Sequence, residues 1–356
     1  FVKFVADTAG GFTNGHWEET TGFGVQYKLD TDTMPWQLVR KQDDASGTVT
    51  GTPYAKYFEW SPAVWIDRAV GDQETAPAPS LVGKTLSGMF FHRNRLGFLA
   101  GQNAVLSEEA RYFNLFRTTV VALLDSDPID VSVPHTSVVT LNHAVPFAEQ
   151  LVLFSDSTQF VLRGDPILTP KTVQVSSVLE YETTRTLAPV ATERGVFFAT
   201  RRDAFSVIRE MFPAAAALDV FLADDTTAAV PQYISGDPVQ LAASTLENLL
   251  LVLADGDRAA LYLYKYFYSG NQKVQSAWSR YTFGNEARIL GFGFIESTLY
   301  LVVQREDGVH LESSVIASGR VDAGAGYLTH LDRRFKAGPD TALPGVFDIV
   351  TNTTSW

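Results

Sequence analysis

Arg95-Leu96-Gly97-Phe98-Leu99-Ala100 leads through Gly101-Gln102-Asn103 into Ala104-Val105-Leu106-Ser107, and this stretch decides the fold. Two apolar runs of strand length joined by a short polar turn predict a β-hairpin. The same pattern returns four times downstream, within residues 150–162, 195–208, 249–264 and 299–311. Turn residues 101, 156, 202, 255 and 307 are separated by 55, 46, 53 and 52 positions. A period near fifty is typical of four-stranded propeller blades, and a large sandwich with evenly spaced hairpins is the alternative.

The rest of the chain follows this rhythm less closely. Residues 36–40 and 56–60 flank a turn near Asp44 and form a weaker sixth copy of the hairpin. The Pro- and Gly-containing residues 70–80 are expected to form an exposed loop, because neither residue type extends a strand ladder there. Residues 212–246 contain a run of four alanines, which indicates an insertion with a short helix or a separate lobe.

We therefore predict an all-β, irregular β-propeller-like body of repeated four-stranded blades over residues 1–335. The Pro- and Gly-rich residues 336–356 are expected to begin a further segment, so that the chain is a fragment of a longer protein.

Composition limits the classes of function. The 356 residues are 46% hydrophobic and 12% aromatic, which permits a large strand-rich core. There is no cysteine, which excludes disulfides, thiolate metal sites and a cysteine nucleophile. The formal charge of −12 argues against a protein that holds nucleic acid through phosphate contacts. No run of 18 apolar residues is present, so no membrane span is expected.

The motifs of catalysis and metal binding do not occur. The histidines lie too far apart in sequence for a metal-ligand pattern; they are His16, His92, His135, His143, His310 and His330. The acidic segment 125–130 lacks the glycine and the distal glutamate of a calcium loop, and an Asp-Pro turn is the better interpretation. Gly291-Phe292-Gly293 has no third glycine, so it is no dinucleotide motif. We predict no catalytic, cofactor or metal residues and no enzyme activity.

One aromatic run has two interpretations. Tyr262, Tyr264, Tyr266, Phe267 and Tyr268 alternate mostly at period two, ahead of Trp278 and Tyr281. Such a run can form a platform that stacks sugars or bases. A pair of core strands with one aromatic face is the simpler interpretation.

Ordered blocks of the sequence resemble a known family. The sharpest block is Met89–Gly101, continued by Val105–Ser107 and Tyr112–Asn114. Other blocks in the same order are 17–20, 27–30, 33–35, 38–40, 127–131, 147–149, 159–162, 230–234, 264–266 and 275–279. Over residues 1–335 the chain resembles the tail nozzle (tail tubular protein B) family of short-tailed phages, the podoviruses.

The resemblance implies a structural subunit of the virion tail that is assembled in the host cytoplasm. It implies a homohexameric ring that continues the tail tube below an adaptor ring, carries tail fibres or spikes, and conducts genomic DNA during ejection. It implies no catalytic residues and no cofactor. Loops 70–80, 125–136 and 212–246 are the candidates for contacts to other rings, a gate or fibres.

In a ring of this kind, the acidic net charge suggests a hypothesis about DNA passage. Six chains that each carry −12 would repel a duplex from all sides of the lumen, so that the DNA slides without phosphate contacts that stall it. Two other classes remain open: a tail propeller that binds a host receptor or glycan, and a polysaccharide-cleaving tail enzyme.

Overall fold

The computed structural model describes residues 1–7, 14–42, 56–214, 217–270, 272–284, 287–316, 346–348 and 353–355. The chain divides into two units, Phe1–Ser314 and Val315–Trp356. In the second unit, β24 (Val346–Asp348) and β25 (Thr353–Ser355) pair in antiparallel fashion. All secondary-structure elements in the described residues are β-strands, so the all-β prediction is confirmed. The expected boundary near residue 335 lies outside the described residues.

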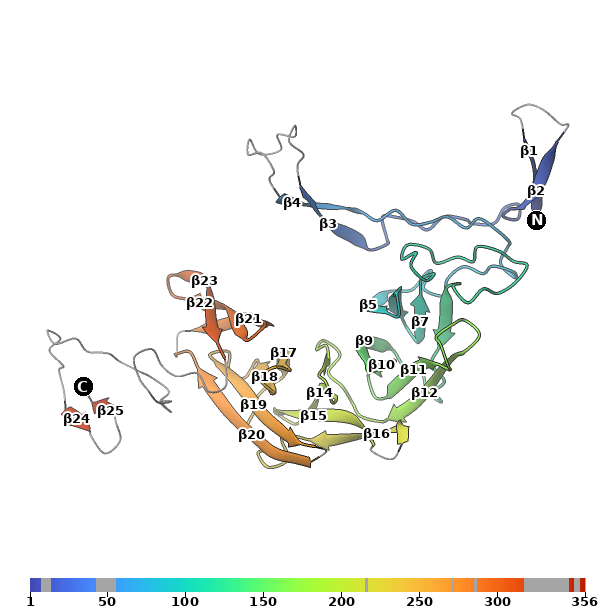
Figure 1. Cartoon of the computed structure of the whole chain (residues 1–356). Helices are drawn as coiled ribbons and strands as arrows, with labels where there is room; N and C mark the ends of the chain where they lie inside the picture. The colour runs from blue at the N-terminus through green and yellow to red at the C-terminus, as the bar shows by residue number, and fades with distance from the viewer. Residues whose placement is uncertain are drawn as a thin grey trace. The chain divides into compact units, whose positions relative to one another are not determined.

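Four sheets of four antiparallel strands and one sheet of three follow one another along the first unit, and we call them blades 1 to 5 (Figure 1). Blade 1 is β5 (Leu86–His92), β6 (Arg95–Ala100), β7 (Asn103–Leu106) and β8 (Ile129–Ser132). Blade 2 is β9 (Leu141–Phe147), β10 (Gln150–Ser155), β11 (Gln159–Gly164) and β12 (Val173–Leu179). Blade 3 is β13 (Val190–Ala191), β14 (Val196–Arg202), β15 (Phe205–Ala214) and β16 (Ala217–Asp225). Blade 4 is β17 (Pro238–Ser244), β18 (Leu249–Ala254), β19 (Ala260–Ser269) and β20 (Gln272–Thr282). Blade 5 is β21 (Arg288–Ile295), β22 (Thr298–Arg305) and β23 (Gly308–Val315).

The five repeated hairpins of the sequence are the second and third strands of these blades. In blades 1 to 4 they are therefore the two central strands of the sheet. A central strand that is covered on both faces reads as a continuous apolar run, because each of its two sets of alternating side chains is buried. The sequence period near fifty thus corresponds to one blade, as predicted.

Side chains of a central strand point alternately to the two faces of its sheet, and each face packs against a neighbouring blade. On β10, Leu151 and Leu153 belong to a core shared with blade 1, whereas Val152 and Phe154 belong to a core shared with blade 3. On β14 the odd and even positions divide between blades 2 and 4 in the same way. The core is therefore a series of layers between sheets, as in sheet-on-sheet packing.

The turn that precedes β6 has a specific backbone conformation. Arg93 and Asn94 connect β5 to β6 with positive φ angles of 48° and 58°, the conformation of a two-residue type I′ hairpin turn. Two strand positions further, Gly97 pairs with Phe90, and a Cβ at Gly97 would overlap the ring of Phe90. The glycine is needed because the aromatic ring covers the backbone at this point.

Two hairpins precede the blades. They are β1 (Val2–Ala6) with β2 (Gly15–Glu19), and β3 (Trp36–Gln42) with β4 (Lys56–Pro62). The predicted sixth copy is correct as a hairpin but wrong as a blade, because the sheet has only these two strands. Its Phe58 and Trp60 are 64% and 63% exposed, unlike the central strands of the blades. Residues 70–80 contain no strand, as expected, but Val70 and Ala76 are buried, so the loop is not exposed throughout.

Segment 212–246, which begins on β15 of blade 3, contains no helix in its described residues, and the expected short helix is wrong. The run of alanines instead lies where β15 ends and β16 begins, with Ala214 paired to Ala217. Sheet pairing overrides the helix propensity of alanine here. Phe221 is buried, while Val220 and Leu222 are half-exposed, which is the alternation of a strand.

Candidate functional site

A fully buried arginine organises the longest loop of blade 1. The guanidinium of Arg95, at the start of β6, is 1% exposed. Its Nη1 donates to the carbonyl oxygens of Ser107, Ser126 and Asp127 at 2.8, 3.1 and 2.7 Å, and its Nη2 donates to that of Asp125 at 2.8 Å. Burial lowers the pKa of Arg95, and the nearby carboxylates of Glu109, Glu108 and Asp127 oppose that shift.

The acidic segment 125–130 is consequently part of a structural loop. Asp127 accepts the backbone N–H of Leu124 at 2.8 Å through Oδ2. Asp130 accepts the backbone N–H and the hydroxyl of Ser80 at 2.7 and 2.6 Å. These contacts agree with the turn interpretation. Among the described residues, no group of three or more His, Asp or Glu side chains could hold a metal ion.

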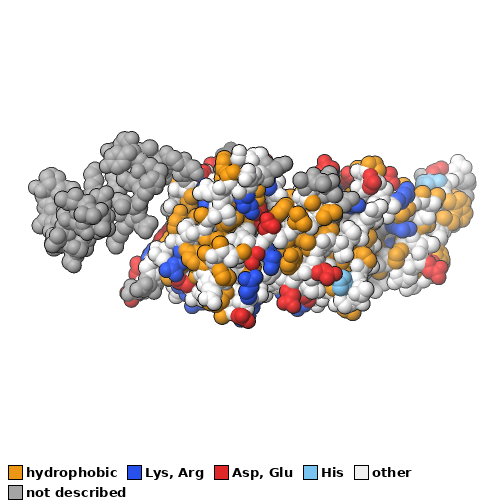
Figure 2. Space-filling view, turned by 90° about the horizontal axis from the view of Figure 1, so that it is seen from below, with side chains coloured by type: hydrophobic (Ala, Val, Ile, Leu, Met, Phe, Trp, Pro, Cys, Tyr) orange, Lys and Arg blue, Asp and Glu red, His pale blue; other side chains and the backbone are white. Residues whose placement is uncertain are grey.

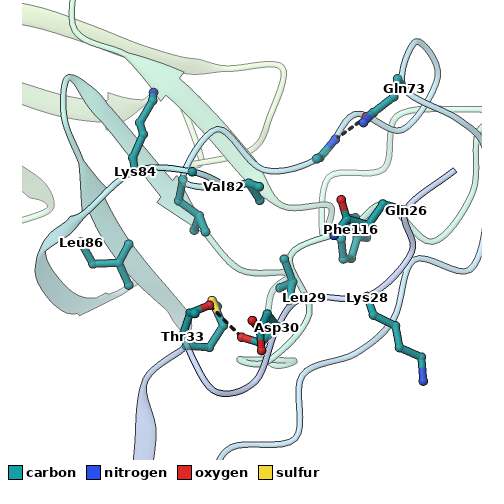
Figure 3. A pocket seen from close by; sticks show the side chains of 14 residues that line it. Gln26, Lys28, Leu29, Asp30, Thr33, Gln73, Val82, Lys84, Leu86 and Phe116 are labelled. Carbon is teal, nitrogen blue, oxygen red and sulfur yellow. Dashed lines mark hydrogen bonds between the residues drawn. The ribbon is translucent and has the colours of Figure 1, made fainter.

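A cavity near this loop has a volume of about 450 Å³ and lies between residues 26–34 and 73–86 (Figure 3). Its wall is mainly apolar, with Leu29, Val82, Leu86 and Phe116 among the side chains drawn in Figure 3.

The charged groups beside this cavity already have partners on the protein. Lys28 lies 3.5 Å from Asp67, and Lys84 donates to Asn103 at 2.8 Å. Thr33 donates its hydroxyl to the backbone oxygen of Asp30 at 2.9 Å. The cavity therefore presents an apolar recess with paired charges at its edges, rather than an acid and a base directed at one point.

The histidines that the sequence shows lie in separate places. His16 lies 3.0 Å from Glu18, His310 lies 3.0 Å from Asp307, and His143 contacts the backbone oxygen of Arg185 at 2.8 Å. His135 lies beside Ser137 and Thr158. His330 lies outside the described residues.

His92 is the buried histidine at the end of β5, where it pairs with Arg95 across the type I′ turn. Burial, with a smaller contribution from the charge of Arg93, lowers the pKa of His92 to about 4. The unfolded chain should titrate near the ordinary value of about 6.5. Between these two values the unfolded state binds the proton and the folded state does not, so folding stability is lost as the pH falls.

We therefore expect His92→Gln to remove a pH dependence. The protein should lose about 3 kcal/mol of unfolding free energy between pH 6.5 and pH 4 because of this group. Urea unfolding at several pH values should show a shallower loss over that window in the variant than in the parent. His16→Gln is the exposed control and should retain the loss of stability that His92 causes over this window. An unchanged slope in His92→Gln would contradict the assignment.

The aromatic strands of blade 4 form core rather than a platform. Tyr262, Tyr264 and Tyr266 are at most 5% exposed and belong to the core between blades 3 and 4. The rings of Tyr264 and Trp278 lie 5.0 Å apart, and Trp278 donates its Nε1–H to the backbone oxygen of Thr226 at 2.8 Å. Of the run, Phe267 is half-exposed. The structural interpretation of these aromatics is confirmed.

The other features read from the sequence are also structural. Gly291–Gly293 lies within β21.

Figure 2 shows apolar side chains on one face of the molecule, intermixed with both acidic and basic ones. In the portion that the structure describes, we find no helix with the length and apolarity needed to cross a membrane.

Sequence reasoning missed the role of Arg95 and the buried state of His92. The signal for Arg95 was present, since it is a charged residue at the start of an apolar hairpin. Its carbonyl partners lie up to 32 residues further along the chain, and no local pattern identifies them.

These features define a repeat-built, β-propeller-like protein. Its repeated hairpins form the central strands of stacked blades. The charged groups described above mostly form hydrogen bonds within loops or ion pairs on the surface. Comparison with known proteins identifies the family. The model of the bacteriophage nozzle protein family matches residues 1–356, and the chain belongs to this family. It is a structural component of a podovirus tail.

The tail tubular protein gp12 of Escherichia phage T7 is 34% identical over 340 residues. The match covers 95% of this chain and 41% of that protein, so the chain spans about two fifths of the relative's length.

Two solved structures with weak similarity are propeller domains. The WD40 domain of Toxoplasma gondii coronin is 11% identical with a TM-score of 0.39, covering 74% of this chain and 65% of that one. The β-propeller domain of Myceliophteria thermophila Cps50 (Swd1) is 8% identical with a TM-score of 0.35, covering 65% of this chain and 84% of that one. The description of the blades rests on their strand order and shared cores.

Proposed function

We propose that this chain is a wall segment of the nozzle ring, which continues the phage tail tube and conducts genomic DNA during ejection. The observation that carries the proposal is the collinear match, over 95% of the chain, to a protein named a tail tubular protein. The stacked blades agree with it, because successive apolar layers give a rigid wall.

The partners follow from the same proposal. The protein forms a homohexamer, contacts the adaptor ring above it and holds tail fibres or spikes outside. DNA passes without sequence-specific binding. The formal charge of −12 per chain supports this, because an acidic lumen offers few of the Lys and Arg contacts that hold phosphates.

The glycan-binding alternative has lost its main support. It was motivated by the aromatic strands and by the exposed acidic turns, and of the aromatic residues Tyr262, Tyr264 and Tyr266 are core residues. The enzyme alternative gains no acid–base pair from the cavity near Phe116.

Negative-stain imaging of the purified full-length nozzle protein tests the proposal. We expect six-fold rings with an axial hole wide enough to admit a DNA duplex. The same preparation is tested for binding of soluble host glycans as a comparison. Monomers that bind glycan and form no ring at any concentration would contradict the tube function and favour the receptor-binding alternative.

A further inference from the structure

The hairpin of β3 and β4 exposes one face that is rich in aromatic side chains. Antiparallel pairing sets Leu38 opposite Trp60 and Arg40 opposite Phe58, so these side chains share a face. Trp36 belongs to the same face, because its ring stacks on that of Trp60 with 6.1 Å between the centroids. The apolar members are between 43% and 64% exposed. We call this surface the β3–β4 aromatic face; its apolar members are Trp36, Leu38, Phe58 and Trp60.

The hairpin of β1 and β2 has a second face of this kind. Phe4 pairs with Trp17, and their rings lie 5.4 Å apart. Val2 pairs with Glu19, two positions along each strand, so both side chains point to the same side as the two rings. Val2, Phe4 and Trp17 are between 39% and 68% exposed. These three residues and Glu19 form what we call the β1–β2 aromatic face.

Both aromatic faces need a partner that covers them. Each hairpin is a sheet of two strands, and such a pair is at best marginally stable in water without packing against another surface. Clusters of large apolar side chains on an exposed face mark a site of interaction. The two hairpins lie well apart in Figure 1, so the faces of one chain do not cover each other.

The charges on the two faces are opposite. The residues of β3 and β4 that alternate onto the aromatic face include two bases, Arg40 and Lys56, and no acid. The β1–β2 aromatic face has one acid, Glu19, and no base. Lys3 lies on the other side of that hairpin, where its ammonium group is 3.6 Å from Glu18. One face is therefore basic and the other acidic, which makes them complementary in charge as well as in apolar character.

We propose that the β3–β4 aromatic face of one copy of this chain packs on the β1–β2 aromatic face of the next copy, an inference that rests on the proposed nozzle ring. Each chain carries both faces, so the contact is head-to-tail, and its repetition leads around a closed ring. Copies with a formal charge of −12 repel one another, and a local pair of opposite charges then decides which surfaces meet.

The rings occupy the centre of this contact and the charges its rim. Glu19 accepts the backbone N–H of Val120 through Oε1 at 3.3 Å, which leaves Oε2 for a base of the neighbouring copy. Arg40 and Lys56 are the bases that the neighbour supplies. The indole rings of Trp36 and Trp60 bury the largest apolar area and contribute most of the affinity.

Assembly of the full-length nozzle protein tests the aromatic contact. Phe58→Ser with Trp60→Ser should raise the concentration at which half of the protein is in rings by at least about tenfold, because buried aromatic side chains dominate interface energies. Mass photometry over a dilution series measures this concentration. Val121→Ser with Val138→Ser is the matched control, at positions 85% and 93% exposed outside the hairpins, and should assemble like the parent. Parental assembly of the aromatic variant would overturn the proposal.

Cross-linking between copies identifies the occupant. The sequence has no cysteine, so Leu38→Cys and Val2→Cys are placed in separate full-length copies, which are mixed and treated with a flexible bismaleimide. A covalent dimer should form in the mixture and should be absent when either variant, or the parent, is treated alone. Dimers of Leu38→Cys with itself would show that like faces meet and would overturn the proposal. Rings that yield no cross-linked dimer in the mixture would also overturn it.

The inference and the proposed function can be told apart when they fail. Rings that form equally well in the parent and in the aromatic variant overturn the inference and leave the nozzle ring in place. A parent protein that forms no ring at any concentration overturns both.

Discussion

Replacing Arg95 with methionine should lower the free energy of unfolding by about 3–5 kcal/mol. Methionine retains much of the apolar stem but removes the guanidinium donor from four backbone carbonyls, those of Ser107, Asp125, Ser126 and Asp127. The carbonyl of Ser126 keeps the backbone N–H of Glu109 as a donor at 3.0 Å. A buried acceptor that loses its partner costs about 1–3 kcal/mol, and the loop can recover only part of this by admitting water. Equilibrium unfolding in urea measures the change.

Arg117→Met is the matched control for this prediction. Arg117 also donates to a carbonyl, that of Thr75 at 3.2 Å, but it makes one such bond from a more accessible position. Its substitution should cost less than about 1 kcal/mol. Limited proteolysis provides a second reading, because residues 108–128 should be cleaved faster in Arg95→Met alone. Equal stability of the two variants would show that the loop does not depend on the buried guanidinium.

The repeat was predictable because the side chains that define a blade are local in sequence. A central strand such as β10 has apolar residues at both odd and even positions, and its turn at Asp156 is polar. Both signals lie within one hairpin. The spacing of about fifty residues between the turns then predicts four-stranded blades, and this prediction does not require knowing which blades pack together.

The incorrect predictions share a physical cause, which is that partners distant in sequence decide local structure. A run of alanines favours a helix in isolation, but β15 and β16 pair in antiparallel fashion on either side of it, and this pairing decides the local structure. The hairpin of β3 and β4 has the right pattern for a blade, yet no further strand joins its sheet. The hydrogen bonds of Arg95 are made to backbone carbonyl oxygens of a loop. Every residue has such an oxygen, so the sequence does not show which ones are used.

One cluster of buried polar groups joins two blades. Glu210, on β15 of blade 3, is 1% exposed and faces Lys273 on β20 of blade 4, and it accepts the hydroxyl of Tyr268 at 2.9 Å. Burial and the charge of Glu210 raise the pKa of Tyr268, so that its hydroxyl remains a donor. The cluster joins two blades at a point where an apolar layer ends.

Lys273→Met should therefore destabilise the protein by about 3–5 kcal/mol, because the carboxylate of Glu210 stays buried after its ammonium partner is removed. The double variant Glu210→Leu with Lys273→Met should be more stable than Lys273→Met alone, since it removes the uncompensated charge as well. Urea unfolding of the two single variants and the double variant gives the interaction energy directly.

Lys171→Met is the control for this cycle, because it breaks an exposed pair with Asp125 whose side chains are 54% and 68% exposed. Solvent screens such a pair, and its loss should cost less than about 1 kcal/mol. If the effects of the two single variants at Glu210 and Lys273 simply add, the pair does not act as a unit. The contact between blades 3 and 4 would then depend on the aromatic core around Tyr264 rather than on this ion pair.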